Sequence, residues 1–384
     1  MLLYLIIIII CFLLDGKKYR NNKTLYTIGC LVVICFLCFG YMVGSDWRQY
    51  ERDYVNDYYV WYVTSGEIGS YWIFKIFKSL GVDFWLFTGI CKILYFYSIL
   101  YLASRFTDKK WSVIGVYIIM SDLLAIIISC PFRNMLAVTV ANFAIALYLN
   151  NKRILSIVLL LLACTFHSAF IVTAAILVSY FFFNKLASRI TSSQYVFIYL
   201  GLYAIILFTP IFDIIYTYAV PFFGLTDLAE QHGTENMKNF LTIGNVKELI
   251  LFMLLVVFRN DILKLKGGNI LFYYAMFSAL GFLLFKCLPV GSRLNILNKF
   301  FYAIVFSQLL HTKLTSNART YLPRFALTIC LLSTFYNMYN TYVYIPYSNS
   351  IPYILTEHKS LEERTMYNYN AYTERTGKVI TGDE

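Results

Sequence analysis

The chain has 384 residues, of which 59% are hydrophobic and only 14% are charged, and its formal net charge is +11. Soluble domains carry roughly 25% charged residues, so the composition excludes an ordinary soluble protein and indicates a polytopic helical membrane protein. The basic residues are dispersed among short loops between apolar runs, which is typical of topogenic charge and argues against a nucleic-acid partner.

Apolar runs recur from one end of the chain to the other, and a run of about 15–20 residues can cross a hydrocarbon core of about 30 Å. The first run, Leu2–Leu14, lacks the basic start and the small-residue cleavage site of a signal peptide, so we interpret it as a retained span. The positive-inside rule predicts that the basic loop Asp15–Lys23 is cytoplasmic. The second span, Leu25–Val43, then leads outward.

Residues 44–71 hold the densest group of charges near the apolar runs, set among tyrosines and tryptophans. The topology predicts that this stretch is an extracytoplasmic loop. Its aromatic side chains are typical of a belt at the membrane interface, and they also suit a groove in which ring-shaped ligands stack. After the loop, Tyr71–Leu80 has apolar residues at helical spacing with two lysines opposite, which favours a short interfacial helix.

The rest of the chain repeats this alternation of apolar runs and basic loops. Further spans are expected at Phe84–Ser104, Trp111–Ser129, Met135–Leu149, Tyr195–Phe212, Val246–Phe258, Ile270–Cys287, Leu294–His311 and Leu322–Tyr342. The run Ile154–Phe183 has basic residues at both ends and is interrupted near His167. We therefore interpret this run as two short helices, and one long tilted helix is the alternative.

The predicted fold is all-α, with about twelve transmembrane helices. One helical membrane domain is expected over residues 1–345, with extracytoplasmic loops at about 44–71 and 213–245, followed by a polar tail over 346–384. The nine cysteines lie mostly inside apolar runs and form no CxxC pair, so no disulfide framework is expected. No HExxH motif, His/Cys cluster, P-loop or GxGxxG occurs, so neither a metal ion nor another cofactor is predicted.

Charges beside membrane spans are costly and therefore indicate functional positions. Arginine offers a planar fork of donors that suits phosphate. Arg133 and Arg293 each follow a proline at the start of a predicted helix, where unpaired N–H groups also favour an anion, and Arg48 and Arg52 are further candidates from the first loop. Interfacial snorkelling or salt bridges to nearby carboxylates would explain the same arginines without a ligand.

Three acidic residues and one histidine are candidates for acid–base work. Asp46, Asp53 and Glu67 could each deprotonate a hydroxyl group. Asp46 could instead cap a helix that begins near Trp47, and Glu67 could belong to a turn. His167 stands alone in an apolar stretch, so it is either a proton acceptor or a hydrogen-bonded structural residue.

Several of these residues stand in short motifs that resemble the EpsG family of Wzy-type polysaccharide polymerases. Gly44-Ser45-Asp46 with Tyr50, followed by Glu67-Ile68-Gly69, is similar to the family pattern G-x-D-x-x-x-Y … E-x-G. Pro131-Phe132-Arg133-Asn134 resembles its Arg-Gln element with Asn134 in place of glutamine, Phe166-His167-Ser168 resembles its Phe-His-x-(S/A) element, and Gly291-Ser292-Arg293 resembles a later arginine at the start of a span.

The resemblance implies a glycosyltransferase of the bacterial cytoplasmic membrane with a fold similar to the glycosyltransferase-C type. Such an enzyme transfers a growing chain from undecaprenyl pyrophosphate to a new lipid-linked repeat unit at the extracytoplasmic side, as in O-antigen or exopolysaccharide biosynthesis. The implied partners are this donor, this acceptor and membrane lipid, with a chain-length regulator as a further candidate. In this interpretation Arg133 and Arg293 hold the pyrophosphate, Asp46 or Glu67 orients or deprotonates the acceptor, and His167 supports them or accepts the proton.

Two other functions would fit a chain of this class. A lipid-linked oligosaccharide flippase predicts an internal repeat and charges along a central cavity, whereas the charges of this chain are expected near one membrane face. An O-antigen ligase would use the same donor and would favour a large outer domain. The surface polysaccharide of a deletion strain separates the three functions.

Overall fold

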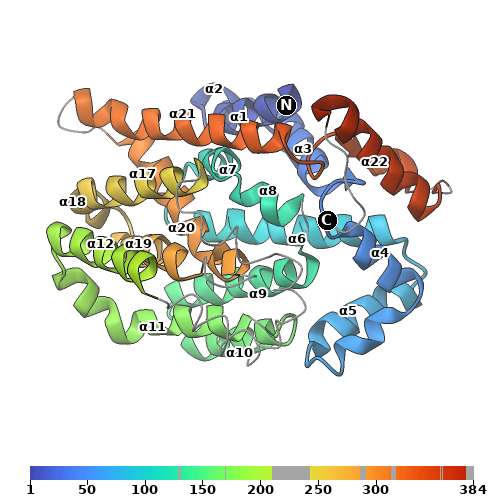
Figure 1. Ribbon diagram of the computed structural model, residues 1–384, viewed down its shortest axis with the longest axis horizontal. Coiled ribbons are helices and arrows are strands. Elements are labelled where there is room, and N and C mark those ends of the chain that lie inside the picture. The colour runs from blue at the N-terminus through green and yellow to red at the C-terminus, as the bar shows by residue number, and fades with distance from the viewer. Residues whose placement is uncertain are drawn as a thin grey trace. The chain divides into compact units, whose positions relative to one another are not determined.

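The computed structural model describes residues 1–128, 131–168, 170–209, 243–285, 291–312, 317–354, 356 and 358–377. The described chain is helical apart from one pair of two-residue strands, which confirms the all-α prediction (Figure 1). It divides into two compact units. Met1–Ile171 and Thr334–Glu384 form the first, and Val172–Ser333 form the second.

The first unit contains the elements that carry most of the predicted site residues. In chain order they are α1 (Leu2–Leu14), α2 (Lys17–Asn21), α3 (Lys23–Cys38), β1 (Gly40–Tyr41), α4 (Trp47–Val55), the 3-10 helix η1 (Tyr58–Tyr62), α5 (Ile68–Ser79), α6 (Phe84–Ala103), α7 (Lys110–Ile119), α8 (Asp122–Ile127), α9 (Phe132–Leu149) and α10 (Arg153–Cys164), then after the second unit β2 (Ser348–Asn349), the 3-10 helix η3 (Ile351–Tyr353) and α22 (Leu361–Thr376).

The second unit is a bundle of apolar helices. They are α11 (Phe170–Arg189), α12 (Ser192–Phe208), α17 (Ile243–Val257), α18 (Arg259–Leu263), α19 (Gly268–Phe285), α20 (Gly291–His311) and α21 (Asn317–Tyr339), of which α11 and α21 also reach into the first unit. Lys299 of α20 forms a mostly buried ion pair with Glu248 of α17 at 3.2 Å. The predicted loop at 213–245 lies outside the described residues, except for the start of α17.

Two of the described helices, α6 and α9, are long and apolar enough to cross a membrane. With 20 residues, α6 extends about 30 Å at 1.5 Å per residue. Other apolar helices, including α1, α3, α7 and α10, are shorter. By length and composition, α6 and α9 are thus the candidate membrane spans among the described helices, while the number of about twelve spans stays a prediction.

Helices α6 and α9 run in the same direction and define two opposite ends of the first unit. Near their starts, the rings of Phe87 and Phe132 lie 5.1 Å apart. Midway, Asn142 Nδ2 donates to Ser98 Oγ at 3.0 Å in a buried contact. Just beyond their last turns, Arg105 Nη1 donates to Asn150 Oδ1 at 3.4 Å.

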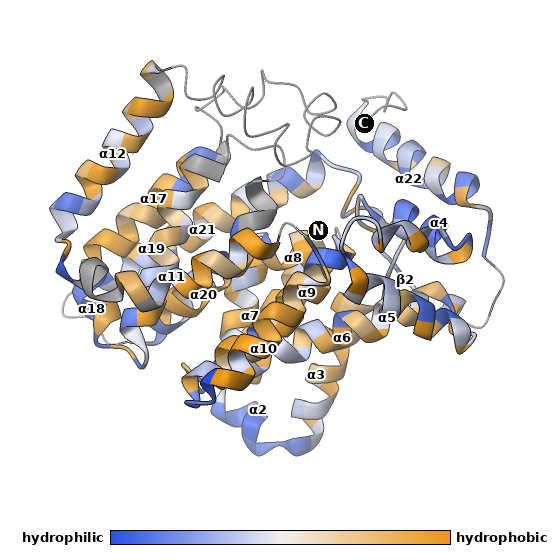
Figure 2. Ribbon diagram, turned by 90° about the horizontal axis from the view of Figure 1, so that it is seen from below, coloured by the Kyte–Doolittle hydropathy of each residue, from blue (hydrophilic) through white to orange (hydrophobic). Residues whose placement is uncertain are grey.

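The end at which α6 and α9 finish is rich in basic residues, and we call it the basic end. It consists of Asp15–Lys23, Ser104–Lys110 and Asn150–Arg153, and Arg20 Nη2 joins the first two loops by donating to the backbone oxygen of Asp108. In Figure 2 the hydrophilic helix α2 lies at the end of the more hydrophobic α3. Elements α4, η1 and α5 belong to the opposite end, because Trp85 in the first turn of α6 contacts Glu51 of α4.

Two predicted spans of the first unit differ most clearly from the observed helices. The expected span Trp111–Ser129 is not one helix: α7 ends at Ile119 and α8 begins at Asp122. Ser121 between them has φ 67°, a left-handed conformation that interrupts a right-handed helix. The expected span Leu25–Val43 also ends early, at Cys38, because the following residues form β1 and pair with β2.

The interpretation of the long apolar run at 154–183 as two helices is confirmed. Helix α10 ends at Cys164 and α11 begins at Phe170, with His167 in the turn between them. The short helix expected at Tyr71–Leu80 is also confirmed. It is α5, which begins three residues earlier than expected, at Ile68. Its exposed side chains include Ile68, Trp72 and Ile76, which repeat every fourth residue along one face, and Leu80 directly after the helix continues this spacing.

The residues predicted to form a polar tail fold back onto the first unit. The N–H of Ser350 donates to the backbone oxygen of Phe39 at 2.6 Å, and β2 pairs antiparallel with β1. In α22, Asn368 Nδ2 donates to the oxygen of Met42 at 2.6 Å. Arg364 of the same helix pairs with Glu51 of α4, and both side chains are less than a tenth exposed. This segment is therefore part of the packed structure.

Candidate active site

A buried carboxylate, Glu67, joins three segments of the first unit. It precedes α5 and is 1% exposed. Its Oε1 lies 2.7 Å from Nδ1 of His167 and accepts the backbone N–H of Ser168 at 3.1 Å. Its Oε2 forms an ion pair with Nη1 of Arg133 at the start of α9. Three residues that the sequence motifs nominated separately are thus brought into one cluster.

Local sequence explains why the start of α5 meets the turn before α11. The N–H of Gly69 donates to the backbone oxygen of Thr165 at 2.9 Å, and Ser70 Oγ donates to that of Phe166 at 2.7 Å. A Cβ atom at position 69 would lie 2.5 Å from Thr165 Oγ1 and 3.2 Å from its carbonyl carbon. Glycine is needed here because any side chain would push the two segments apart.

Arg133 is held between its carboxylate partner and an aromatic wall. Its guanidinium carbon lies 4.9 Å from the ring centre of Tyr62 and 5.1 Å from that of Trp61. Its Nε lies 3.5 Å from the hydroxyl of Tyr50. No described residue accepts a hydrogen bond from Nη2, and the side chain is 20% exposed. The arginine therefore keeps donors available for an anion while its position is fixed from two sides.

The aromatic wall is supported by a second buried carboxylate. Asp53 of α4 is 1% exposed and accepts a hydrogen bond from Tyr62 at 3.0 Å and one from Gln49 Nε2 at 2.8 Å. Each of its two oxygens has a donor from the protein. This arrangement assigns Asp53 to positioning the tyrosine under Arg133, whereas the sequence had nominated it as a base.

The charge state of Glu67 follows from its neighbours. Burial alone would raise its pKa, but the hydrogen bond from His167, the positive charge of Arg133 and the Ser168 N–H outweigh burial, so the pKa is lowered. A carboxylate can only accept hydrogen bonds, so Nδ1 of His167 donates to it. Nε2 of His167 has no hydrogen-bond partner among the described residues. A neutral His167 can therefore accept a proton at Nε2 while Glu67 stabilises the resulting cation.

The other sequence candidates lie in different surroundings. Asp46 is the N-cap residue of α4, at the position that the capping interpretation gave it, but its side chain makes no capping hydrogen bond and accepts from Ser45 Oγ at 2.6 Å. Arg48 donates to the hydroxyls of Tyr369 and Tyr342, which ties it to the C-terminal segment.

The remaining two arginines are not part of the observed cluster. Arg52 is exposed and donates to Gln49 Oε1 at 2.6 Å. Arg293 lies in the first turn of α20, in the second unit, and its side chain is outside the described part of the chain. Its convergence with Arg133 stays a prediction. Within the described ranges, no group of three or more His, Cys, Asp or Glu side chains could hold a metal ion.

Sequence reasoning missed the residues that complete the cluster. Ser168 contributes its backbone N–H, and Tyr50, Trp61 and Tyr62 surround Arg133. The crowding of aromatic residues in the first loop was a visible signal, but it did not distinguish an interfacial belt from a wall around one arginine. The serine beside His167 carried no signal of its own.

Comparison with known proteins gives one finding. A family model described as the EpsG family matches residues 23–355, which include every residue of the cluster around Glu67 and exclude α22. No curated protein and no solved structure matches the chain.

Proposed function

The chain belongs to the EpsG family, and from this premise we propose that it is a polysaccharide polymerase that joins undecaprenyl-pyrophosphate-linked oligosaccharide repeat units. Membership in this family supports the assignment of the chain as a membrane protein of polysaccharide biosynthesis, with a glycosyltransferase activity similar to that of a polymerase. The observation that carries the more specific proposal is the cluster in which Glu67 holds both Arg133 and His167. One cation for a leaving group and one proton acceptor are what glycosyl transfer from a pyrophosphate requires.

Arg133 is assigned to the pyrophosphate of the donor. As the bond between the sugar carbon and the phosphate oxygen breaks, negative charge grows on the leaving group, and a fixed guanidinium stabilises it. The arginine lies in the first turn of α9, where the helix dipole adds to the attraction for an anion. Arg293, at the start of α20, is assigned as a second phosphate ligand on the strength of the sequence motif.

His167 is assigned as the proton acceptor. The acceptor hydroxyl oxygen forms the new bond to the sugar carbon, its proton passes to Nε2 of His167, and undecaprenyl pyrophosphate departs. Glu67 fixes the tautomer through Nδ1 and stabilises the imidazolium. Glu67 itself is an unsuitable base because it is 1% exposed and its oxygens are engaged by protein donors. Asp46 remains a candidate for contact with the acceptor.

The orientation of the site is proposed to be extracytoplasmic. The cluster lies at the start of α9, and the basic end lies beyond its last turn, so one apolar helix separates them. The positive-inside rule assigns the basic end to the cytoplasm. Donor and acceptor would then be lipid-linked units already exposed at the outer face, in agreement with the absence of any nucleotide-binding motif from the sequence.

The test is a polymerisation assay with purified protein and lipid-linked repeat units. Arg133→Ala should lower the rate at least about 100-fold, as loss of a single charge-stabilising group does in other enzymes. His167→Gln should be similarly impaired. Arg52→Ala is the matched control, because it removes the same charge from an exposed residue whose side chain bonds, within the described ranges, only to Gln49. Thermal unfolding of each variant in detergent separates inactivity from misfolding.

Either of two results would contradict the proposal. Full-length polymer from a folded Arg133→Ala protein would contradict the assignment of Arg133 to the pyrophosphate of the donor. A deletion strain that loses all surface polysaccharide, or that makes polymer not attached to its core, would indicate a flippase or a ligase in place of a polymerase, whereas single capped repeat units indicate the polymerase.

A further inference from the structure

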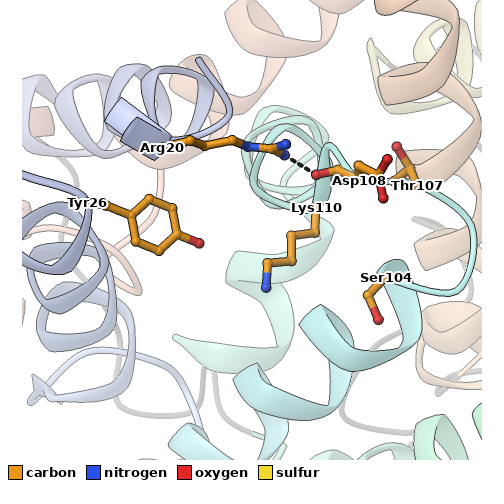
Figure 3. Close-up of a pocket in the computed structure, with 6 residues that line it drawn as sticks. All are labelled: Arg20, Tyr26, Ser104, Thr107, Asp108 and Lys110. Carbon is orange, nitrogen blue, oxygen red and sulfur yellow. Dashed lines mark hydrogen bonds between the residues drawn. The ribbon is translucent and has the colours of Figure 1, made fainter. Parts of the chain in front are cut away.

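The basic end of the first unit contains a pocket that the proposed reaction does not use. Its cavity volume is about 360 Å³, and Figure 3 shows the six residues that line it, from the α2–α3 region, the end of α6 and the start of α7. The lining residues are Arg20, Tyr26, Ser104, Thr107, Asp108 and Lys110. The pocket is therefore built from the ends of helices that are distant in sequence.

The pocket holds two cations with unused donors. Lys110 Nζ makes no hydrogen bond or ion pair with a described residue, whereas the neighbouring Lys109 donates its Nζ to the backbone oxygen of Asp15 at 2.9 Å. Arg20 uses Nη2 for Asp15 and for the backbone oxygen of Asp108, which leaves its Nε and Nη1 without a described partner. In Figure 3 the ammonium of Lys110 extends into the space between Tyr26 and Ser104.

The walls of the pocket are fixed by contacts behind them. The Asp15 carboxylate is 2% exposed and accepts from the N–H of Ser112 at 2.6 Å and from Arg20 at 3.1 Å. The indole of Trp111 donates to the hydroxyl of Tyr26 at 2.8 Å, which fixes the tyrosine in the wall of the pocket. Arg20 and Tyr26 are consequently held in place before any ligand arrives, which lowers the ordering cost of binding.

The charge of this region favours an anion. The loops Asp15–Lys23 and Ser104–Lys110 carry four and three basic residues respectively, against one aspartate each. Asp108 supplies the one carboxylate among the six lining residues. Phosphate is the anion that such a combination of ammonium, guanidinium and hydroxyl donors suits best.

An apolar surface next to the pocket distinguishes a lipid from a free phosphate. Tyr26 lies in the first turn of α3, and the same helix exposes Leu25, Ile28 and Leu31, which are 42%, 52% and 54% exposed. These three residues follow one another at helical spacing away from the pocket. A phosphate bound beside Tyr26 would place attached acyl chains along this surface.

We propose that this pocket binds the phosphate of an anionic phospholipid whose acyl chains lie along α3. Basic pockets between helix ends at the cytoplasmic side of membrane proteins bind such headgroups. The site lies at the opposite end of α6 from the Glu67 cluster, so its ligand is distinct from the polymerase substrate and the inference does not depend on the proposed reaction.

The experiment measures lipid binding by the purified full-length protein in neutral detergent. Phosphatidylglycerol and phosphatidylcholine micelles are titrated separately, with native mass spectrometry counting the lipids that stay bound. Lys110→Gln should weaken phosphatidylglycerol binding about fivefold, the effect of one basic residue near a charged lipid surface. Lys152→Gln is the matched control, because Lys152 is an exposed lysine of the basic end that does not line the pocket.

Three outcomes would overturn the proposal. Unchanged phosphatidylglycerol binding by Lys110→Gln would show that the pocket is not the site. An equal loss in Lys152→Gln would show that the attraction is general to the basic end. Inorganic phosphate that competes with the lipid at equal concentration would indicate a site for free phosphate, in which the surface of α3 has no part. Lys110→Arg, which keeps the charge, should retain binding.

Discussion

At the scale of single residues, the charge on Glu67 is the central quantity. Donors from two separate segments, the turn His167–Ser168 and the start of α9, converge on a carboxylate that is 1% exposed. Its folded pKa lies below the ordinary value of 4.5 although burial opposes this, since the hydrogen bond from His167 and the charge of Arg133 prevail. The ionised form therefore stabilises the folded protein. The stabilisation by ionised Glu67 is fully present above the ordinary carboxyl pKa. It is lost as the pH falls through the lowered pKa that Glu67 has in the folded protein.

Glu67→Gln should remove this acid-dependent part of the stability. At pH 7 the variant is expected to be less stable by about 1.5–3 kcal/mol, the range for hydrogen bonds to charged groups. Between pH 5 and pH 3 its melting temperature should fall less steeply than that of the wild type. Thermal unfolding in detergent across this range is the measurement, with the exposed Glu362→Gln as the control. Parallel curves for Glu67→Gln and wild type would contradict the assignment.

At the scale of elements, the approach of α5 to the turn before α11 depends on one glycine. Gly69→Ala would place its Cβ atom 2.5 Å from Thr165 Oγ1 and 3.2 Å from backbone atoms, so the hydroxyl could rotate away but the backbone would have to move. The expected cost is about 1–3 kcal/mol, typical of overpacking. Because the movement separates Glu67 from His167, polymerisation should fall more than the stability loss alone explains.

The control for this substitution is Gly201→Ala in α12. A Cβ atom there would meet nothing within 4 Å, so the change should leave stability the same or raise it slightly. Thermal unfolding and polymer yield are measured for both variants. If Gly69→Ala behaves like Gly201→Ala, the close approach of the two segments does not matter for the site.

The contact of α22 with α4 is a second element-scale feature. Arg364 Nη1 donates to Glu51 Oε1 at 3.0 Å and lies 2.8 Å from Oε2, and Trp85 donates to the same carboxylate at 3.1 Å. Burial raises the pKa of Glu51, and the hydrogen bond and charge of Arg364 do not fully offset it. Glu51 thus depends on its partner to remain charged in this position.

Arg364→Met should therefore destabilise the protein by about 3–5 kcal/mol, because it leaves a buried carboxylate unpaired. The double variant Arg364→Met with Glu51→Gln should lose less than the single variant, since no charge is then left without a partner. A double-mutant cycle by thermal unfolding gives the coupling energy. Additive losses from the two single variants would show that the pair is not coupled and that α22 is held by its other contacts.

At the scale of the whole molecule, the first unit has two ends separated by the length of α6 and α9. One is the basic end, and the other, which we call the site end, carries the cluster around Glu67. The apolar helix α6 extends about 30 Å, which is the thickness of a hydrocarbon core. We expect the two ends to face different compartments. The positive-inside rule places the basic end in the cytoplasm.

Labelling with a membrane-impermeant maleimide tests this orientation. Val60→Cys in η1 at the site end should react in intact cells, because the native side chain is 56% exposed. Lys152→Cys at the basic end should react only after the membrane is permeabilised. The wild-type protein, with its nine native cysteines, is the blank. Reaction of Lys152→Cys in intact cells would reverse the proposed orientation.

Much of the helical framework could be predicted from the sequence, because the signals that mark a helix lie within the helix and at its two ends. Apolar runs and their flanking charges located α1 at its observed bounds, and α6 within one residue, at Phe84–Ala103. The break at His167 was visible for the same reason, since polar residues interrupt an apolar run there. Ser121 carried no comparable mark, because a serine in the left-handed region looks like any other serine, and the division between α7 and α8 was missed.

The sequence by itself determined that this is a helical membrane protein of the EpsG family and which short motifs hold its polar residues. Only the tertiary structure decided which of those residues meet. Arg133 and His167 are 66 and 100 positions away from Glu67 in the chain, and no local pattern encodes that distance. For the same reason the C-terminal segment was predicted only as a polar tail, whereas Arg364 in fact pairs with a buried carboxylate 313 positions earlier. Long-range ion pairs depend on how helices pack, and packing is a property of the folded chain.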